Sequence, residues 1–193
     1  MADGQIFHEY NLSFRRNLKA AVDSTTERPI QLLWDNVLNT FFFTPPQRGR
    51  FPETSFVIES KTAALQTGHE ADCIVVEVRY VGSSTNFPER QIFFVECKKN
   101  GEDTSAGWRQ AETQLAQYCQ LNLNHACTSL YAAVGIGTKV LFYKWEESDG
   151  SPMNQMSPMH QGTLNFSIPA DRPRIEAFLD HIKTTGWDRS FGR

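Results

Sequence analysis

The segment 91–98 (QIFFVECK) places the strongest constraint on how this chain can fold. Its residues are apolar at consecutive positions from Ile92 to Val95, so a strand here has two apolar faces. Strands of this kind lie inside a sheet that is covered on both faces. The sequence therefore predicts a layered fold whose central strand ends in two charged residues, Glu96 and Lys98.

Four other segments carry apolar residues at helical spacing and are predicted to be helices, namely 12–22, 27–43, 108–121 and 171–185. In the second, Thr26 is a candidate N-cap and Pro29 suits the first turn. In the last, Asp171 is the candidate N-cap. These helices are expected to cover the predicted sheet.

Patterns rich in β-branched and aromatic residues predict further strands at 55–61, 71–80, 129–134, 139–145 and 163–168. The pair around the sequence GIGT is expected to be a hairpin, and 82–88, 100–107 and 146–162 are expected to be loops. The order of elements indicates a mixed α/β fold, a central sheet flanked by helices. We expect an N-terminal extension (1–26), a core (27–145), and a C-terminal part (146–193) whose loop, short strand and helix pack on that core.

Composition excludes several classes of protein. The chain has 193 residues, of which 40% are hydrophobic, which is enough for a packed core. No segment approaches the roughly 18 apolar residues of a membrane span, and the N-terminus lacks the apolar centre of a signal peptide. We therefore expect an intracellular protein, in the cytoplasm or nucleus, with no membrane partner. The net charge of −3 excludes a strongly basic coat for nucleic acid, although a local basic cleft is compatible with it. The four cysteines include no CxxC pair and are expected to be core thiols.

The charged end of the central strand is the first candidate for chemistry. Glu96 and Lys98 are two residues apart, so they point to the same face. Asp72 opens the preceding strand, and its carboxylate approaches Glu96 if the two strands are antiparallel neighbours. Two such carboxylates repel each other unless a cation lies between them, and Mg²⁺ binds to one or two carboxylates together with water and phosphate oxygens. The alternative is a strand that runs out into solvent with a surface ion pair.

The helix at 108–121 supplies a second group of polar residues. Gln114 and Tyr118 are four positions apart and share a face, while Trp108, Leu115 and Cys119 are expected to face the core. Taken alone, Gln114 and Tyr118 also suit an ordinary helix surface.

Together these residues resemble the PD-(D/E)xK nuclease superfamily. The resemblance is carried by Asp72, by Glu96-Cys97-Lys98 at an apolar strand end, and by the helix sequence QLAQY, which is similar to its RecB-like and type I restriction-subunit branches. It covers roughly 27–145. It implies a restriction-endonuclease-like three-layer core with a mixed central sheet. It also implies an enzyme that uses Mg²⁺ or Mn²⁺ to hydrolyse phosphodiester bonds of nucleic acid, with DNA favoured over RNA.

The resemblance also implies roles for individual residues. Asp72, Glu96 and the backbone carbonyl of Cys97 would hold the metal ion. Lys98 would position or help to deprotonate the attacking water and stabilise the transition state, and Gln114 would orient the water, a phosphate or Lys98. The substrate-binding residues would be Tyr118, Lys99 and Arg109.

The family also has an acidic residue on its first helix. Glu27, Asp35 and Glu59 are candidates for this role, and Asp35 is preferred because it lies in the middle of its helix.

Another class of function stays open, a nuclease-like fold without catalysis that serves as a nucleic-acid or protein-binding module. The acidic balance and the absence of a basic run favour it. The sequence is compatible with a homodimer as well as a monomer. It contains no HExxH or GxSxG motif, and GIGTK lacks the spacing of a phosphate-binding P-loop.

Overall fold

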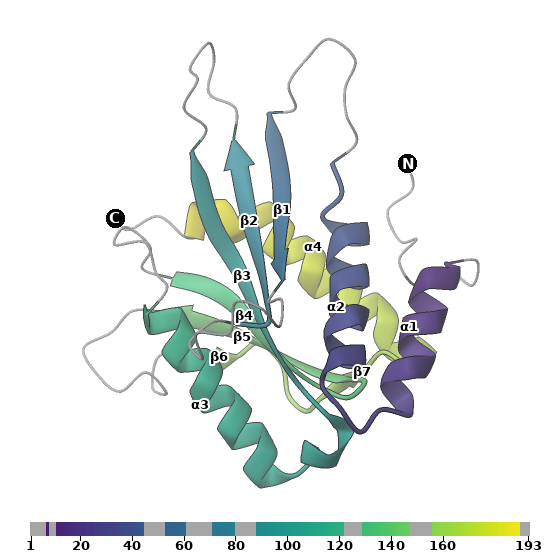
Figure 1. Ribbon diagram of the computed structural model, residues 1–193. Coiled ribbons are helices and arrows are strands. Elements are labelled where there is room, and N and C mark those ends of the chain that lie inside the picture. The colour runs from purple at the N-terminus through teal and green to yellow at the C-terminus, as the bar shows by residue number, and fades with distance from the viewer. Residues whose placement is uncertain are drawn as a thin grey trace.

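A computed structural model describes residues 7, 11–44, 53–60, 71–79, 88–121, 129–146 and 156–189. These residues form a sheet with helices on both faces (Figure 1). The predicted loop at 82–88, except for its last residue, and most of the predicted loop at 146–162 lie outside the described residues.

The observed elements follow the predicted order with few differences. The four predicted helices and the strand assignments up to 145 are confirmed within a few residues at each end. A strand inside the predicted loop at 146–162 was missed, and the predicted strand at 163–168 is reduced to two residues. The elements are α1 (Leu12–Val22), α2 (Arg28–Phe41), β1 (Thr54–Ser60), β2 (Cys73–Arg79), β3 (Glu89–Lys98), a 3-10 turn (Asn100–Glu102), α3 (Ser105–Leu121), β4 (Ser129–Ile136), β5 (Lys139–Glu146), β6 (Met156–Pro158), β7 (Leu164–Asn165), a second 3-10 turn (Pro169–Asp171) and α4 (Arg172–Arg189).

The sheet is mixed, as predicted. Its strands lie in the order β1-β2-β3-β4-β5-β6, and β7 pairs with β5 outside this sequence of neighbours. The β3–β4 pair is parallel, and the other described pairs are antiparallel. Parallel neighbours need a crossover connection, and α3 provides it between β3 and β4.

Strand β3 has the two buried faces that its sequence predicts. Phe93, Val95 and Cys97 join the apolar core formed with α1, α2 and α4. Phe94 points to the other face, where it packs in the core beneath α3. Glu96 follows the same alternation and therefore faces the α3 side. The structure thus establishes a mixed α/β fold with a sheet between helices (Figure 1).

Helix α1 lies within the segment expected to be an extension, and it is built into this core. Phe14 and Ala21 are buried there together with residues of α2. At the end of α1, the side chain of Asn100 donates to the carbonyls of Ala21 and Val22, at 2.8 Å each. Because Asn100 follows the end of β3 closely, these bonds attach α1 to the charged end of the central strand.

The predicted hairpin turn is confirmed, and it also packs against the end of β3. Gly137, between β4 and β5, has a φ of +59°, which favours glycine. Its backbone N–H donates to the carbonyl of Lys98 at 3.0 Å. A Cβ at this position would lie 1.6 Å from the Asn100 side-chain oxygen. Glycine is therefore required here by both conformation and space.

The N-cap predicted for α2 is wrong. Helix α2 begins at Arg28, so its N-cap position is Glu27, which makes no side-chain capping bond. Thr26 lies one residue too early, and its carbonyl accepts from the Ser24 hydroxyl at 2.6 Å. Asp171 lies directly before α4, at the position predicted for its N-cap. Its side chain accepts a bond from the backbone N–H of Asn165 at 2.9 Å, which connects the start of α4 to β7.

Three of the four cysteines, Cys73, Cys97 and Cys119, are buried free thiols, as predicted for core residues. Cys127 lies outside the described residues. In the described part of the chain, no helix has the length and apolar character needed to cross a membrane.

Candidate functional site

Asp72 is held at the charged end of β3. The register pairs Cys73 with Val95, so Asp72 comes next to Glu96 when the antiparallel pairing is extended by one residue. One carboxylate oxygen of Asp72 accepts from the backbone N–H of Cys97 at 2.7 Å. The other accepts from the side-chain amide of Gln31, on α2, at 2.8 Å. Asp72 is 6% exposed, so its orientation is set by these donors and not by solvent.

Lys98 and Glu96 form a buried ion pair beside Asp72. The ammonium nitrogen Nζ lies 2.8 Å from Glu96 Oε1 and 3.6 Å from Glu27 Oε1. Burial alone lowers the pKa of Lys98, but attraction by Glu96, and then by Glu27 and Asp72, outweighs it and raises this pKa above its ordinary value. Lys98 is therefore an ammonium group at neutral pH.

Helix α2 supplies two of the residues around this pair. Glu27 and Gln31 are one turn apart and both face the ends of β2 and β3. Asp35, one turn further on, lies elsewhere, because its Oδ1 accepts from the Ser60 hydroxyl at 2.5 Å and from the Cys73 thiol at 3.4 Å. The structure thus brings Glu27, and not the preferred Asp35, to Lys98. The third candidate, Glu59, is exposed on β1.

Helix α3 covers the same group from the other side. Tyr118 is 6% exposed, and burial followed by the negative charge of Glu96 raises its pKa to about 12. Leu115 and Cys119 are buried as predicted, and Tyr118 joins their apolar cluster instead of standing on the helix surface. The side-chain oxygen of Gln114 is buried and has no hydrogen-bond partner among the described residues.

The two predicted phosphate-contacting residues make local contacts on the surface. Lys99 is exposed and lies 3.7 Å from the carboxylate of Glu102. Arg109 is exposed and donates to the carbonyl of Ser105, one turn earlier on α3, at 3.2 Å. Both follow the end of β3 in sequence. The group around Lys98 consists of four buried residues, Asp72, Glu96, Lys98 and Tyr118, and two half-buried residues of α2, Glu27 and Gln31. We refer to these six residues as the acidic cluster.

Gln31 was not predicted, and Glu27 was considered but not preferred. The available signal was spacing, because Glu27, Gln31 and Asp35 recur every four residues and so lie on one side of α2. That pattern identifies the polar side of the helix. It does not determine which of its turns meets β3.

The composition of the acidic cluster suits a hard divalent cation. Three carboxylates, Asp72, Glu96 and Glu27, surround one ammonium group, and hard cations bind to oxygen. Among the described residues, no group of three His, Cys, Asp or Glu side chains is arranged to hold a metal ion. A Mg²⁺ ion held here by Asp72 and Glu96 alone would take its remaining ligands from water, substrate or backbone oxygens. The role predicted for the Cys97 carbonyl stays a prediction.

Comparisons with protein-family models, with curated proteins and with solved structures find no match for this chain. The class of protein established by the fold and the site is a mixed α/β protein with a buried acidic cluster at the end of its central strand. Any function assigned to it depends on the geometry of that cluster.

Proposed function

We propose that this protein is a Mg²⁺-dependent nuclease that hydrolyses phosphodiester bonds of nucleic acid, with DNA favoured over RNA. The observation that carries the proposal is the acidic cluster, in which Asp72, Glu96 and Lys98 are 6%, 3% and 9% exposed at the adjacent ends of β2 and β3. A purely structural ion pair requires one carboxylate for one lysine. The cluster holds a surplus of negative charge, whose burial is costly unless a cation offsets it.

Asp72 and Glu96 are the residues that would hold the metal ion. Bound Mg²⁺ supplies an activated water and neutralises negative charge that develops on the scissile phosphate. The Cys97 N–H and the Gln31 amide orient the carboxylate of Asp72, so its direction is set before any ligand arrives. An oxygen can accept a second bond, so these donors do not prevent metal binding.

Lys98 supplies a fixed positive charge beside the proposed metal ligands. Its contacts with Glu96 and Glu27 keep it protonated, so its role is to stabilise the negative charge of the phosphate. The buried oxygen of Gln114 is an unused acceptor that can orient the hydrogen of a water molecule or of the Lys98 ammonium. Tyr118 retains its proton at neutral pH and can donate it to a phosphate oxygen.

A second candidate function is a binding module with no catalysis. The observation that favours it is that both oxygens of Asp72 already accept bonds from the protein and that Lys98 already contacts two carboxylates. Such a network is able to hold the strand ends together without a metal ion. In this case the protein binds nucleic acid or another protein but does not cut.

A nicking assay on supercoiled DNA, with single-stranded DNA and RNA in parallel, separates the two functions. The parent protein is compared with Glu96→Gln, in Mg²⁺, in Mn²⁺ and in EDTA. The nuclease proposal requires metal-dependent cutting that Glu96→Gln abolishes. Absence of cutting by a folded parent on every substrate would leave the binding module as the better account.

A further inference from the structure

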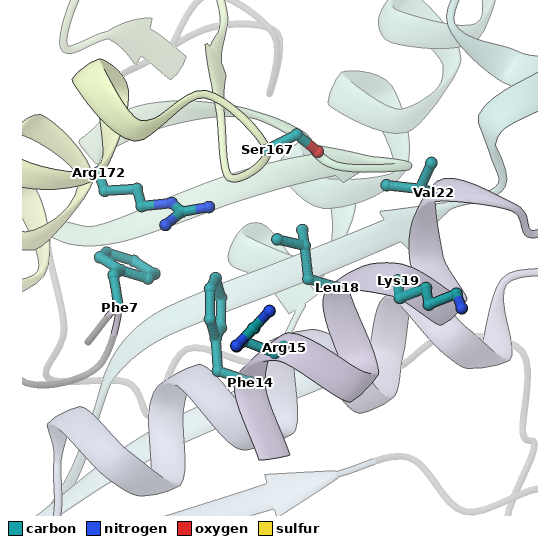
Figure 2. A pocket seen from close by; sticks show the side chains of 8 residues that line it. All are labelled: Phe7, Phe14, Arg15, Leu18, Lys19, Val22, Ser167 and Arg172. Carbon is teal, nitrogen blue, oxygen red and sulfur yellow. The ribbon is translucent and has the colours of Figure 1, made fainter. Parts of the chain in front are cut away.

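A pocket of about 380 Å³ lies between α1 and the segment that leads into α4, outside the acidic cluster (Figure 2). Figure 2 shows the side chains of α1 along one wall, Ser167 and Arg172 opposite, and Phe7 at one end. The residues that line it are Phe7, Phe14, Arg15, Leu18, Lys19, Val22, Ser167 and Arg172. A pocket of this size is in the range of small-ligand sites, which are about 300–1,000 Å³.

The charges around this pocket have one sign. Arg15, Lys19 and Arg172 line it, and no Asp or Glu is among the described residues that do so. Arg15 and Lys19 are four residues apart on α1, where two like charges destabilise a helix. The whole chain carries a net charge of −3, so this concentration of positive charge runs against its overall balance.

The pocket also has an apolar wall, and its Arg172 side chain is held in place by the protein. Phe7 and Leu18 are half-buried and pack against the core, while Phe14 beneath them is buried. The side chain of Arg172 donates to the carbonyl of Phe166 at 2.9 Å, and its guanidinium lies 5.6 Å from the centre of the Phe14 ring. Arg172 is therefore held at the pocket wall by the protein itself.

We propose that this pocket binds one nucleotide unit of a single-stranded nucleic acid, with the phosphate at Arg15 and Lys19 and the base against Phe7 and Leu18. Positive charge beside an apolar or aromatic surface is the combination that proteins use for single strands. The bonds from Asn100 to the end of α1 connect this wall to the chain just beyond Lys98. The pocket would hold a strand on the same body as the acidic cluster. This inference rests on the proposed function, since it assigns that function an anchoring site for its substrate.

The test measures binding of a fluorescent oligothymidylate in EDTA, where no cutting occurs, at several salt concentrations. Arg15→Glu and Lys19→Glu are compared with Arg16→Glu, which changes an exposed residue of the same helix that does not line the pocket. The pocket variants should each bind at least about tenfold more weakly, with the salt dependence reduced by about one ion. Arg16→Glu should stay close to the parent. Equal losses in all three variants would overturn the proposal.

An oligonucleotide of the same length without bases tests the apolar wall. The parent should bind it more weakly than oligothymidylate, and replacing Leu18 with Ser should remove that difference. If inorganic polyphosphate competes as well as oligothymidylate, the pocket is only a general anion site and the proposal is wrong.

If the pocket variants lose binding but the parent never cuts, the anchoring site stands and the nuclease proposal fails. Thermal melts of each variant check that the fold is retained, and the double variant Arg15→Gln, Lys19→Gln replaces any that is not.

Discussion

The two ends of the β2–β3 strand pair both bury a carboxylate beside a cation, yet they are built differently. At one end, three carboxylates of the acidic cluster surround Lys98. At the other end, Glu77 is 2% exposed and lies 2.9 Å from Arg79, with Arg90 as its register partner on β3. The first end has more carboxylates than cations. The second has two arginines around Glu77, and the negative charge of Asp188 on α4 contributes to raising the pKa of Glu77.

Helix α4 covers the second end. The guanidinium groups of Arg79 and Arg90 lie 4.2 and 4.1 Å from the centre of the Trp187 ring. Arg90 also donates to the carbonyl of Trp187 at 2.9 Å. Close packing of the helix is possible because Gly186 has no side chain, and a Cβ there would lie 2.9 Å from that of Ile92. We refer to Glu77, Arg79, Arg90 and Trp187 as the arginine–tryptophan end.

The comparison shows that a buried ion pair is not by itself a sign of function. The arginine–tryptophan end uses its charges to attach α4 to the sheet, and stacking on Trp187 stabilises the cations without a ligand. The acidic cluster lies at the other end of the strands, between Glu27 and Gln31 of α2 and Tyr118 of α3, and no aromatic ring is shown stacking on its lysine among the described residues. Both ends keep a buried acceptor oxygen without a partner among the described residues, Glu77 Oε2 at one and Gln114 Oε1 on α3 at the other. The surplus of negative charge around Lys98 is therefore what distinguishes the candidate site.

The largest expected effect comes from Lys98→Met, which keeps the length of the side chain and removes its charge. If Lys98 acts on the phosphate, cutting should fall by about 10²–10³-fold or more, as for loss of one stabilising group in a transition state. In Mg²⁺ the melting temperature should stay within a few degrees of the parent, because the ion still offsets the charge of Glu96. A nicking assay and a thermal melt on the same samples measure both quantities.

Arg79→Met is the matched control at the arginine–tryptophan end. It should leave cutting intact and lower the free energy of unfolding by about 1–3 kcal/mol, because the buried Glu77 loses its ion partner. If Lys98→Met unfolds while the parent never cuts, both ends are structural and the contrast between them disappears.

Divalent ions should stabilise the fold through the acidic cluster alone. At a Mg²⁺ concentration one hundred times the dissociation constant, the free energy of unfolding should rise by about 2.7 kcal/mol. Melts with and without Mg²⁺ or Mn²⁺ measure this rise. It should vanish in Asp72→Asn and persist in Glu77→Gln, which alters the other end. An equal response of parent and Asp72→Asn would count against a site shared by Asp72 and Glu96.

A smaller effect is expected from pH at the arginine–tryptophan end. Burial raises the pKa of Glu77, and the ion pair with Arg79 offsets this only in part. The folded state therefore holds the proton more tightly than the unfolded state, and the contribution of Glu77 to stability falls as pH rises through the range just above its ordinary pKa. Glu77→Gln should gain stability relative to the parent between pH 4 and pH 7. Glu59→Gln, an exposed carboxylate on β1, should show no such trend in the same melts.

The smallest effect is expected from deletion of residues 1–10. The polar N-terminal sequence predicts that this deletion leaves folding intact, and the ring of Phe7 packs 4.9 Å from Phe14 and 5.9 Å from Phe166. Unfolding should stay cooperative, with a loss of about 0.5–1.5 kcal/mol for an aromatic contact. Both strand ends should keep their responses to Mg²⁺ and to pH. Loss of cooperative unfolding in a denaturant titration would show that this terminus is essential to the fold.

Several elements of the site could be predicted because their causes are local or follow from neighbouring strands. The apolar run before Glu96 identifies the central strand, and antiparallel pairing with the preceding strand brings Asp72 to its end. Other features depend on contacts between residues far apart in sequence. Tyr118 is buried because that turn of α3 packs against the sheet. The spacing of apolar residues along a helix does not predict which of its turns packs against the sheet.

The sequence by itself determined the four helices and the first five strands, that β3 lies inside the sheet, and which charged residues lie at its end. These follow from side-chain periodicity and from the cost of leaving apolar faces in water. Only the tertiary structure decided that Glu27 and Gln31 reach the acidic cluster while Asp35 bonds to Ser60, and that α1 belongs to the core. The reason is physical: every turn of an amphipathic helix presents the same kind of face, and the packing of α2 against the sheet selects the turn that meets β3.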